Sequence, residues 1–414
     1  MSPRASALVD AGRALASGDA LRALGLVGRV ESALGLTLRG IAYAQLGDLE
    51  EARRALERVV ALPAAAPDGQ GDDGGLTRAR ARAALVEIAL SSGDPAPAAR
   101  AAKASAEELE RAGDGRNAAM QRLVLARAEV LLGRLGEARR IVEAVLATNL
   151  DADIRAVASL AQAEIAIRAV ATTDARAALV RARRSLEGAP NQLLARAVVA
   201  LEEELSLPVA RVVRRGVVRE ADLFAIEAFS RGEVLLVDAC RRVAIAGRVT
   251  IPLARRSVLF ALLMELARAW PAGLARDELA SRAFGARRVN ASHRARLRVE
   301  IGRLRKVLAE LAAEPTATAE GYQLSSERDV ALLLPPSDDE AARIALLLGD
   351  GAAWSAQGLA EHAGVSKSTA QRALGALVKS GGAIRTGSGK DVRYTRPGTP
   401  IASRMLLLGL VPRT

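Results

Sequence analysis

Residues 354–395, WSAQGLAEHAGVSKSTAQRALGALVKSGGAIRTGSGKDVRYT, contain the parts of a helix-turn-helix followed by a β-hairpin, in that order. Ser355 is placed to cap a short helix, because its hydroxyl can accept a bond from a backbone N–H of the first turn. Gly364 follows that helix at a sharp turn, where a residue that tolerates positive φ is needed. Ser366 is expected to cap a second helix, whose apolar residues recur at helical spacing: Ala370, Ala373, Leu374, Leu377 and Val378.

The first turns of this second helix carry polar and basic side chains away from its apolar face. Short hydroxyls, an amide and cations are the groups that reach phosphates and base edges when such a helix enters the major groove of DNA. Residues 383–385 and 392–394 alternate around the glycine-rich turn 387–389, which predicts a β-hairpin with basic edges. The candidate DNA contacts here are Lys367, Ser368, Thr369, Gln371 and Arg372 on the helix, and Arg385, Lys390 and Arg393 on the hairpin.

This stretch resembles the winged helix of MarR-, GntR- and IclR-like bacterial regulators, in which the pattern V-S-x-S-T-x-x-R-x-L-x-x-L recurs, here over residues 365–377. The resemblance implies a winged helix-turn-helix domain over residues 338–398 that reads double-stranded DNA. A winged helix that makes only protein contacts is the alternative.

The distribution of charge points to two polyanion-facing surfaces. The chain of 414 residues has a net charge of +12. Residues 287–306 contribute +7 and residues 366–396 contribute +6, so the remainder is close to neutral. A general excess of charge would favour solubility alone, whereas two concentrated segments favour nucleic-acid binding.

The remaining bulk properties predict a cytoplasmic, nucleoid-associated protein. The single cysteine, Cys240, excludes a disulfide framework and is expected to be a small buried hydrophobe. The N-terminal sequence lacks the apolar region of a signal peptide. No uncharged run approaches the roughly 18 residues of a membrane span, and we expect no membrane contact. The apolar residues 405–411, in a C-terminal tail of residues 399–414, are expected to pack or to support a homodimer.

An internal repeat occupies residues 1–206. A Gly between helices followed by a small residue early in the next helix suits a helical hairpin, because the Gly turns the chain and the small side chain lets the helices approach. This five-residue offset joins Gly18 to Ala23, Gly47 to Ala52, Gly93 to Ala98, Gly133 to Ala138 and, in a degenerate copy, Thr172 to Ala177.

The clearest copy, residues 40–52 (GIAYAQLGDLEEA), resembles the tetratricopeptide repeat (TPR), with Tyr43, Gly47, Ala52 and Pro63 on its usual positions. The resemblance implies a TPR-like α-solenoid whose concave surface binds a protein partner or a small effector. An array that serves only as an oligomerisation scaffold is the alternative. Residues 63–75 (PAAAPDGQGDDGG) predict a flexible loop, whose aspartates lack the spacing of a calcium-binding EF-hand.

Residues 207–334 form a second segment with a different pattern. Residues 209–218 and 234–251 are rich in β-branched residues and predict strands, with turns at Gly216 and at residues 246–248. Helices are expected over residues 256–269, 276–284 and about 292–311, followed by a hairpin. The last helix carries an apolar stripe that would seat it on its own domain: Leu297, Ile301, Leu304 and Leu308.

This order resembles the OmpR-type effector domain of response regulators, with matching signatures at residues 277–279 (DEL), 301–308 (IGRLRKVL) and 321–324 (GYQL). The resemblance implies a second winged helix, with Arg303, Arg305 and Tyr322 on family contact positions. Arg294, Arg296 and Arg298 add charge that favours phosphates. Thr318, Glu320, Glu300 and Gly302 depart from the family pattern. A solvated basic helix or a dimerisation role is therefore the alternative to DNA contact.

Residues 335–339 (PPSDD) predict a linker in which Asp338 caps a helix over residues 339–348. We predict no catalytic residues, cofactor or metal, because the two histidines lie far apart in sequence and lack companions of metal-ligand type. His293 is expected to contact a phosphate, and His362 to be a surface or capping residue.

The sequence thus predicts a mainly α protein, with a TPR-like α-solenoid followed by two winged-helix (α+β) domains. Its predicted function is transcriptional regulation, with phosphate anchoring by Arg294, Arg298, Arg303, Arg305, Lys390 and Arg393 and base reading by residues 367–372. Two other functions remain open at this point. One is a TPR scaffold or adaptor whose winged helices contact proteins, and the other is a nucleoid-associated protein without sequence preference.

Overall fold

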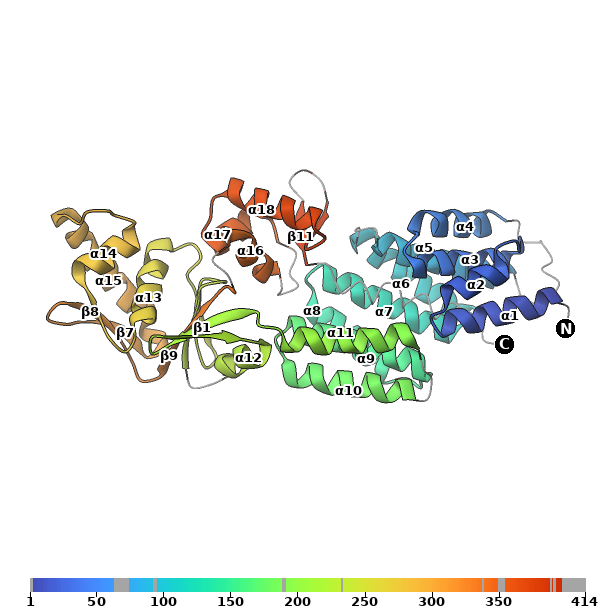
Figure 1. The fold of residues 1–414 in the computed structure, drawn as a ribbon, viewed down its shortest axis with the longest axis horizontal. Coiled ribbons are helices and arrows are strands. Elements are labelled where there is room, and N and C mark those ends of the chain that lie inside the picture. The colour runs from blue at the N-terminus through green and yellow to red at the C-terminus, as the bar shows by residue number, and fades with distance from the viewer. Residues whose placement is uncertain are drawn as a thin grey trace. The chain divides into compact units, whose positions relative to one another are not determined.

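The protein is mainly α-helical with a smaller portion of sheet, as seen in a computed structural model (Figure 1). The structure describes residues 3–62, 74–91, 95–187, 191–231, 234–336, 339–348, 354–387, 389 and 392–396. The chain forms two compact units. The first comprises residues 3–204 with residues 384–396, and the second comprises residues 205–348 with residues 354–383.

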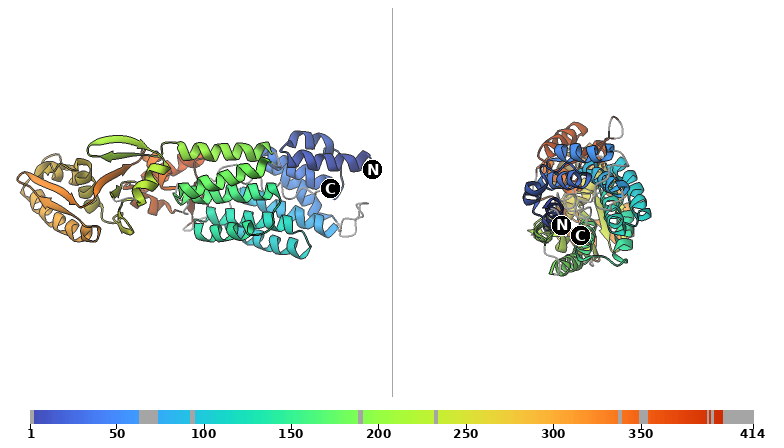
Figure 2. Two further views of the ribbon diagram at one scale, coloured as in Figure 1. Left: turned by 90° about the horizontal axis from the view of Figure 1, so that it is seen from below. Right: turned by 90° about the vertical axis from the view of Figure 1, so that its right-hand side faces the viewer.

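The first unit is an array of helices in which each helix from α1 to α9 packs against the next one along the chain (Figures 1 and 2). The helices are α1 (Pro3–Ala16), α2 (Ala20–Val27), α3 (Ala33–Leu46), α4 (Leu49–Ala61), α5 (Gly74–Ser91), α6 (Pro95–Arg111), α7 (Gly115–Leu131), α8 (Leu135–Leu146), α9 (Ala152–Arg168), α10 (Thr172–Glu187) and α11 (Gln192–Ser206).

Neighbouring helices in this array differ in how much of their surface is covered. Thirteen of the 17 residues of α7 are buried, whereas in α8 only Ala138, Val142 and Val145 are. A helix buried on most sides lies inside an assembly, and one with a narrow buried face lies at its outside. Helix α7 is therefore an inner helix of the array and α8 an outer one.

The repeat predicted from the sequence corresponds to the helix-to-helix turns. Gly18, Gly47 and Gly133 all have positive φ, and the alanines five residues later are fully or almost fully buried. Between α3 and α4 the approach is close, because a Cβ on Gly40 would lie 2.7 Å from Cγ of Leu56. Gly93 lies outside the described residues.

The degenerate copy was assigned two residues too far along the chain. Val170, with φ of 55°, occupies the turn position, and its N–H donates to the Ile167 carbonyl at 3.0 Å, as Gly133 donates to Val130. Ala175 is the buried partner, while Ala177 is exposed. The sequence pattern hid this copy because a β-branched residue rarely adopts left-handed backbone.

The two ends of the array touch. The Asn191 side-chain amide, at the start of α11, donates to the Ala16 carbonyl at the end of α1 at 2.6 Å. A Cβ on Gly18 would lie 3.1 Å from Cγ of Leu193. The array therefore closes on itself, and it is not an open solenoid. Most of the predicted loop, residues 63–73, lies outside the described residues, but Gly74 and Gly75 begin α5 and are not loop residues.

The second unit combines two sheets with seven helices in the part that the structure describes. Its elements are β1 (Ala210–Arg214), β2 (Val217–Ala221), α12 (Leu223–Arg231), β3 (Val234–Asp238), β4 (Val243–Ala246), β5 (Val249–Pro252), α13 (Ser257–Ala269), β6 (Leu274–Ala275), α14 (Arg276–Phe284), α15 (Ala291–Leu308), the 3-10 turn Ala309–Leu311, β7 (Ala313–Ala317), β8 (Gly321–Ser326), β9 (Asp329–Leu334), α16 (Glu340–Leu348), α17 (Ala356–Ala363) and α18 (Lys367–Lys379).

The larger sheet has the strand order β2-β1-β9-β3-β4-β5, in which β3 and β9 are parallel and the other neighbours antiparallel. Successive side chains of a strand point to opposite faces. Leu235 and Val237 accordingly pack in the core with α13 and α15, and Leu236 packs on the other face with Ile226 and Phe229 of α12. The smaller sheet, β6-β8-β7, contains the predicted hairpin.

The predicted strands, helices and hairpin of residues 207–334 are present, with ends that differ by a few residues. Helix α12 and strand β9 were not predicted from the sequence. Strand β9 pairs with β3, which lies more than 90 residues earlier in the chain, so a local sequence pattern does not predict this pairing. The buried stripe of α15 is confirmed, because Leu297, Ile301, Leu304 and Leu308 are its buried residues.

The helices of the helix-turn-helix have the predicted caps. The Gly358 N–H donates to Ser355 Oγ at 3.0 Å, and the Thr369 N–H donates to Ser366 Oγ at 3.1 Å. Gly364, with φ of 70°, ends α17 as predicted. At α16 the capping group among the described residues is Asp339, whose Oδ1 accepts from the Ala341 N–H at 3.3 Å. Asp338 lies outside the described residues.

Within the part of the chain that the structure describes, none of the helices has the length and apolar character of a membrane span.

Candidate nucleic-acid interface

Helix α18 presents a polar first turn above an apolar base. Ala370, Ala373 and Leu374 are its buried residues, and the helix packs against α16 and α17. The side chains that project outward are exposed: Lys367, Ser368, Gln371 and Arg372. This arrangement follows from the helical period, because positions three and four apart share one face. The predicted base-reading side chains, apart from Thr369, are therefore available on the first two turns of one helix.

Thr369 is less available than its neighbours on α18. It is half-buried, and its hydroxyl accepts a hydrogen bond from Ser366 Oγ at 2.9 Å. The Ser366 and Ser368 hydroxyls also lie 2.8 Å apart. Thr369 thus helps to hold the start of the helix, and contacts outside the domain fall mainly to the other four side chains.

Arg372 forms a weak ion pair on the surface of the domain. Its side chain is 79% exposed, and its Nη2 lies 3.8 Å from Glu340 Oε2 on α16. Exposed pairs of this kind contribute little to stability. The guanidinium can therefore leave Glu340 for a base edge or a phosphate at small cost.

The hairpin that follows α18 in sequence consists of β10 (Ile384–Thr386) and β11 (Arg393–Thr395), with Arg385 opposite Tyr394. It belongs to the first compact unit, where Arg396 pairs with Glu204 of α11 at 2.6 Å. Arg385 is exposed. Arg393 is half-buried, and its Nη1 donates to the Val392 carbonyl at 2.9 Å. Lys390 lies outside the described residues.

Helix α15 carries four of the predicted phosphate contacts, and three are engaged within their own domain. Arg294 makes two hydrogen bonds to Asp277 of α14, at 2.7 and 2.5 Å. Arg303 pairs with Glu300 at 3.0 Å, and Arg305 pairs with Glu314 of β7 at 3.1 Å. Arg298 is exposed, and no ion pair to it is found among the described residues. Arg298 is thus the one of the four that needs no carboxylate to be displaced.

The pairing of Arg294 with Asp277 shifts the pKa of both groups. The hydrogen bond from Arg294 lowers the pKa of the Asp277 carboxyl below its ordinary value of 3.8. The same bond raises the pKa of Arg294. The carboxylate and the guanidinium are therefore both charged at neutral pH, and each partly cancels the field of the other.

Two further side chains have roles that differ from those predicted. Tyr322 is only 8% exposed and packs in the core with α13 and α15, so we do not retain it as a DNA contact. The His293 ring accepts from the Asn290 N–H through Nδ1 at 3.3 Å and closes a capping box at the start of α15. The same ring stacks against Phe284, with ring centroids 6.3 Å apart. His293 is thus a capping residue. The other histidine, His362, was predicted to be a surface or capping residue. Its Nδ1 lies 2.8 Å from the Gly358 carbonyl within α17.

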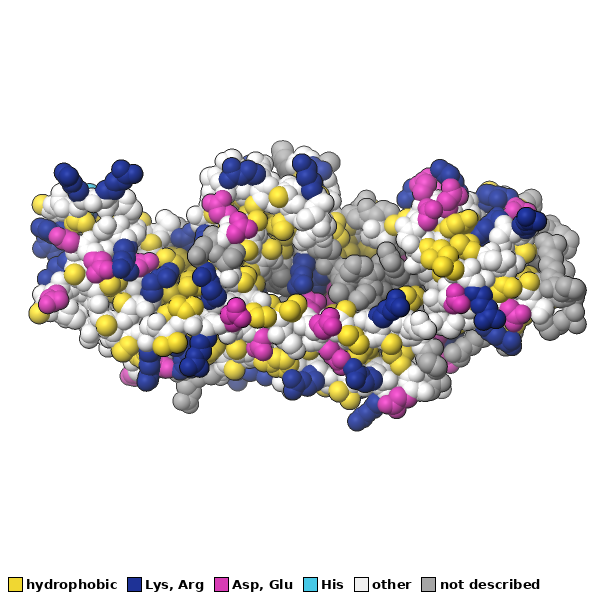
Figure 3. Space-filling view, in the orientation of Figure 1, with side chains coloured by type: hydrophobic (Ala, Val, Ile, Leu, Met, Phe, Trp, Pro, Cys, Tyr) yellow, Lys and Arg dark blue, Asp and Glu magenta, His cyan; other side chains and the backbone are white. Residues whose placement is uncertain are grey.

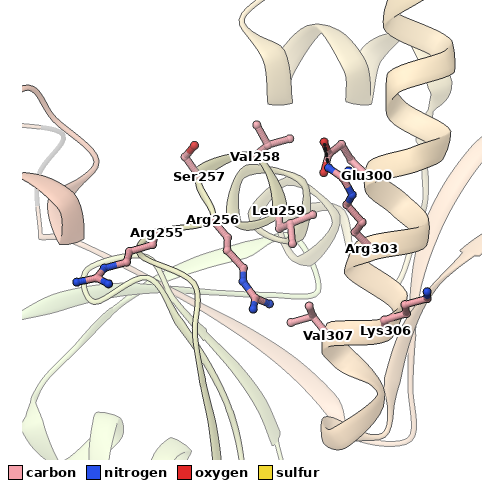
Figure 4. A pocket seen from close by; sticks show the side chains of 9 residues that line it. All are labelled: Arg255, Arg256, Ser257, Val258, Leu259, Glu300, Arg303, Lys306 and Val307. Carbon is pink, nitrogen blue, oxygen red and sulfur yellow. Dashed lines mark hydrogen bonds and ion pairs between the residues drawn. The ribbon is translucent and has the colours of Figure 1, made fainter.

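A basic cleft of about 530 Å³ lies between the start of α13 and one side of α15. Its floor includes Val258, Leu259 and Val307 (Figure 4). In Figure 4, Arg256 reaches from the start of α13 toward α15, while Arg255 points away. Among the described residues, no carboxylate pairs with Arg256 or Lys306.

The sequence analysis missed these two cations as contact residues. Arg256 falls outside the two basic segments, and only the tertiary fold brings it to the cleft that Lys306 also lines. The adjacent arginines at positions 255 and 256, directly before a helix, were the signal that could have found it.

On the face drawn in Figure 3, Lys and Arg side chains gather over the end of the α14–α15 pair and, separately, over α18. In the described ranges, no group of three or more His, Cys, Asp and Glu side chains is placed to hold a metal ion. Cys240 is 2% exposed, and burial raises the pKa of its thiol, as does Asp238. It is therefore the inert buried residue that was expected.

Comparison of this chain with models of protein families, with curated proteins and with solved structures gave no match.

Proposed function

We propose that this protein is a transcriptional regulator that binds double-stranded DNA in a sequence-specific manner. The observation that carries the proposal is the first two turns of α18, where Lys367, Ser368, Gln371 and Arg372 are exposed together while the opposite side of the helix is buried. Such turns offer amide, hydroxyl and guanidinium groups of the kind that read base edges in the major groove.

In this proposal the DNA phosphates are bound by cations that are not paired with a carboxylate. Arg298 of α15 is one of these cations, and Arg256 and Lys306, which both line the basic cleft, are two others in the second unit. Each phosphate neutralised by such a residue releases condensed counterions, so affinity falls as salt rises. In this proposal α18 supplies specificity, and α15 with its cleft supplies mainly salt-dependent affinity.

The helical array of the first unit would bind a protein partner or a small effector, and the chain would act as a homodimer in the bacterial nucleoid. These roles rest on the TPR resemblance and on the two-fold symmetry common among DNA-binding regulators. Light scattering of the purified protein with and without DNA tests the dimer directly.

One observation favours a second candidate, a scaffold whose winged helices contact proteins. Three predicted phosphate contacts of α15 are already paired with carboxylates of their own domain. A basic helix neutralised in this way also suits a solvated surface or a protein interface.

A selection of genomic fragments by the purified protein, at low and near-physiological salt, separates these functions. The proposal predicts enrichment of a motif at both salts. The triple variant Lys367→Ala, Gln371→Ala, Arg372→Ala should abolish the enrichment, whereas Lys379→Ala, at the far end of the same helix, should retain it. Binding without enrichment would indicate a nucleoid-associated protein without sequence preference. Absence of binding at either salt would reject the DNA function and favour the scaffold.

A further inference from the structure

Arg242 is a buried arginine without a carboxylate partner in the second unit. It lies in the turn between β3 and β4, has φ of 55°, and is 9% exposed. No ion pair to Arg242 is found among the described residues, and its Nε has no hydrogen-bond partner there. An unpaired buried charge is costly, because the loss of hydration is not offset by an opposite charge.

The guanidinium of Arg242 lies between two parts of the second unit. Its Nη2 donates to the Ser257 carbonyl at the start of α13, and its Nη1 donates to the Glu361 carbonyl in the last turn of α17, both at 3.5 Å. The group also lies over the Phe260 ring, 5.0 Å from its centroid. Arg242 therefore connects the sheet and α13 with the helix that precedes α18.

The contact with α17 is made at the turn that directs α18. Gly364 is favoured by its φ of 70°, and a Cβ there would lie 2.6 Å from Arg242 Nη1, so a side chain would displace the end of the guanidinium. Arg343 of α16 approaches the same helix end, where its Nη1 donates to the Ala363 carbonyl at 3.1 Å. Cations are favourable at the C-terminal end of a helix, where carbonyl groups lack partners.

Other links between α17 and the β5–α13 connection are weak. Arg255 lies 3.9 Å from Glu361, but its side chain is 92% exposed, and such pairs contribute little. Arg242 is thus the main buried polar contact in this joint.

We propose that Arg242 is a positioning residue that holds the α17–α18 turn against α13, and so sets the separation between α15 and α18. Two recognition helices at a set separation read a composite site with one preferred spacing. This consequence for DNA rests on the proposed function, whereas the joint itself does not.

The joint is tested without DNA by a distance measurement between spin labels in the full chain. Ala295 on α15 and Ala376 on α18 are both exposed and can be replaced by labelled cysteines, in a Cys240→Ala background. The test variant is Arg242→Met, because methionine is flexible, fills a similar space and carries no donors. We expect the distance distribution to widen while the melting temperature is unchanged or higher, since an uncompensated buried charge has been removed.

Two comparison variants complete this measurement. Arg242→Lys keeps the charge but replaces the planar guanidinium, whose two Nη groups donate to different carbonyls, with a single ammonium nitrogen, so an intermediate width is expected. Arg248→Met, at an exposed position in the next turn, should leave the distribution narrow. An unchanged distribution in Arg242→Met, with the protein folded, overturns the positioning role.

The DNA consequence is measured with composite sites in which the two halves are separated by varied spacers. The wild type should lose about tenfold or more in affinity when a half-turn of about 5 bp is inserted. Arg242→Met should lose less, because a loose joint tolerates both spacings. Equal spacing losses in both proteins would reject the DNA consequence. If neither protein binds DNA, the proposed function fails, and the distance measurement still decides the joint.

Discussion

Helices α15 and α18 lie in segments of almost equal net charge, yet they differ in how much of that charge is free. On α15, Arg294, Arg303 and Arg305 are paired with carboxylates at 2.5–3.1 Å. On the first two turns of α18, the one ion pair found among the described residues joins Arg372 to Glu340 at 3.8 Å. Similar charge in sequence therefore corresponds to one helix with half of its six cations paired to carboxylates, and to another whose exposed cations are paired only weakly.

This difference predicts that α15 and α18 contribute differently to the proposed DNA binding. A cation that must leave a carboxylate before it binds a phosphate contributes only the difference between the two interactions. A cation in water contributes nearly its whole interaction with DNA. We therefore expect α18 to dominate sequence choice and α15 to contribute mainly through Arg298 and Lys306, its cations that are unpaired among the described residues.

The largest effect is expected for Arg372→Ala. If Arg372 reads a base, the variant should lose about 1–3 kcal/mol on the selected motif and little on random DNA. Competition titrations with both DNAs measure this difference. Equal losses on the two would show that Arg372 is only a phosphate contact and would remove the main distinction between the helices.

A second effect should separate two arginines of the same helix. Arg298→Ala should lower the salt slope of DNA binding by about one. Arg294→Ala should lower it less, because Arg294 is held by two hydrogen bonds to Asp277. Affinities on random DNA at several salt concentrations give both slopes. If the salt slope falls by the same amount in both variants, pairing with a carboxylate does not reduce the contribution of an α15 cation to DNA binding.

A smaller effect of the opposite sign is expected for Asp277→Asn. This variant keeps the shape of the side chain and removes the charge that neutralises Arg294. Affinity for random DNA should rise slightly and the salt slope should steepen, as α15 becomes more like α18. The exposed Glu320→Gln variant, with the same change in charge, is the control for a general electrostatic effect.

The smallest effect is expected on the stability of the folded state at low pH. The folded state lowers the pKa of Asp277, so the pair contributes stability that is present above the ordinary pKa of 3.8 and is lost as pH falls through the lowered value. The difference in denaturation midpoint between the wild type and Asp277→Asn should thus be constant from pH 7 to about pH 5 and shrink below pH 3.8. A difference that shrinks already near pH 6 would contradict this assignment.

The local features of this protein could be predicted from sequence because their causes lie within a few residues. The caps Ser355 and Ser366, the turn at Gly364 and the buried stripe of α15 depend on helical period and on backbone groups three or four positions away. Val170 was missed because a turn normally marked by glycine is made there by a β-branched residue.

The state of each candidate contact depended on residues far away in the chain. Asp277 and Arg294 are 17 residues apart, and Arg242 and Glu361 are 119 apart. Tyr322 matched a contact position in sequence, but the packing of β8 against α13 buried it.

The sequence by itself therefore determined the mainly helical class, the helices and caps of the helix-turn-helix, and the places where charge is concentrated. Only the tertiary structure decided which of those charges are neutralised, which strands are neighbours, and that a buried arginine joins α13 to α17. Local elements follow from short-range periodicity and hydrogen bonding. The free energy of a charge, in contrast, depends on the solvent and the partners that the complete fold brings to it.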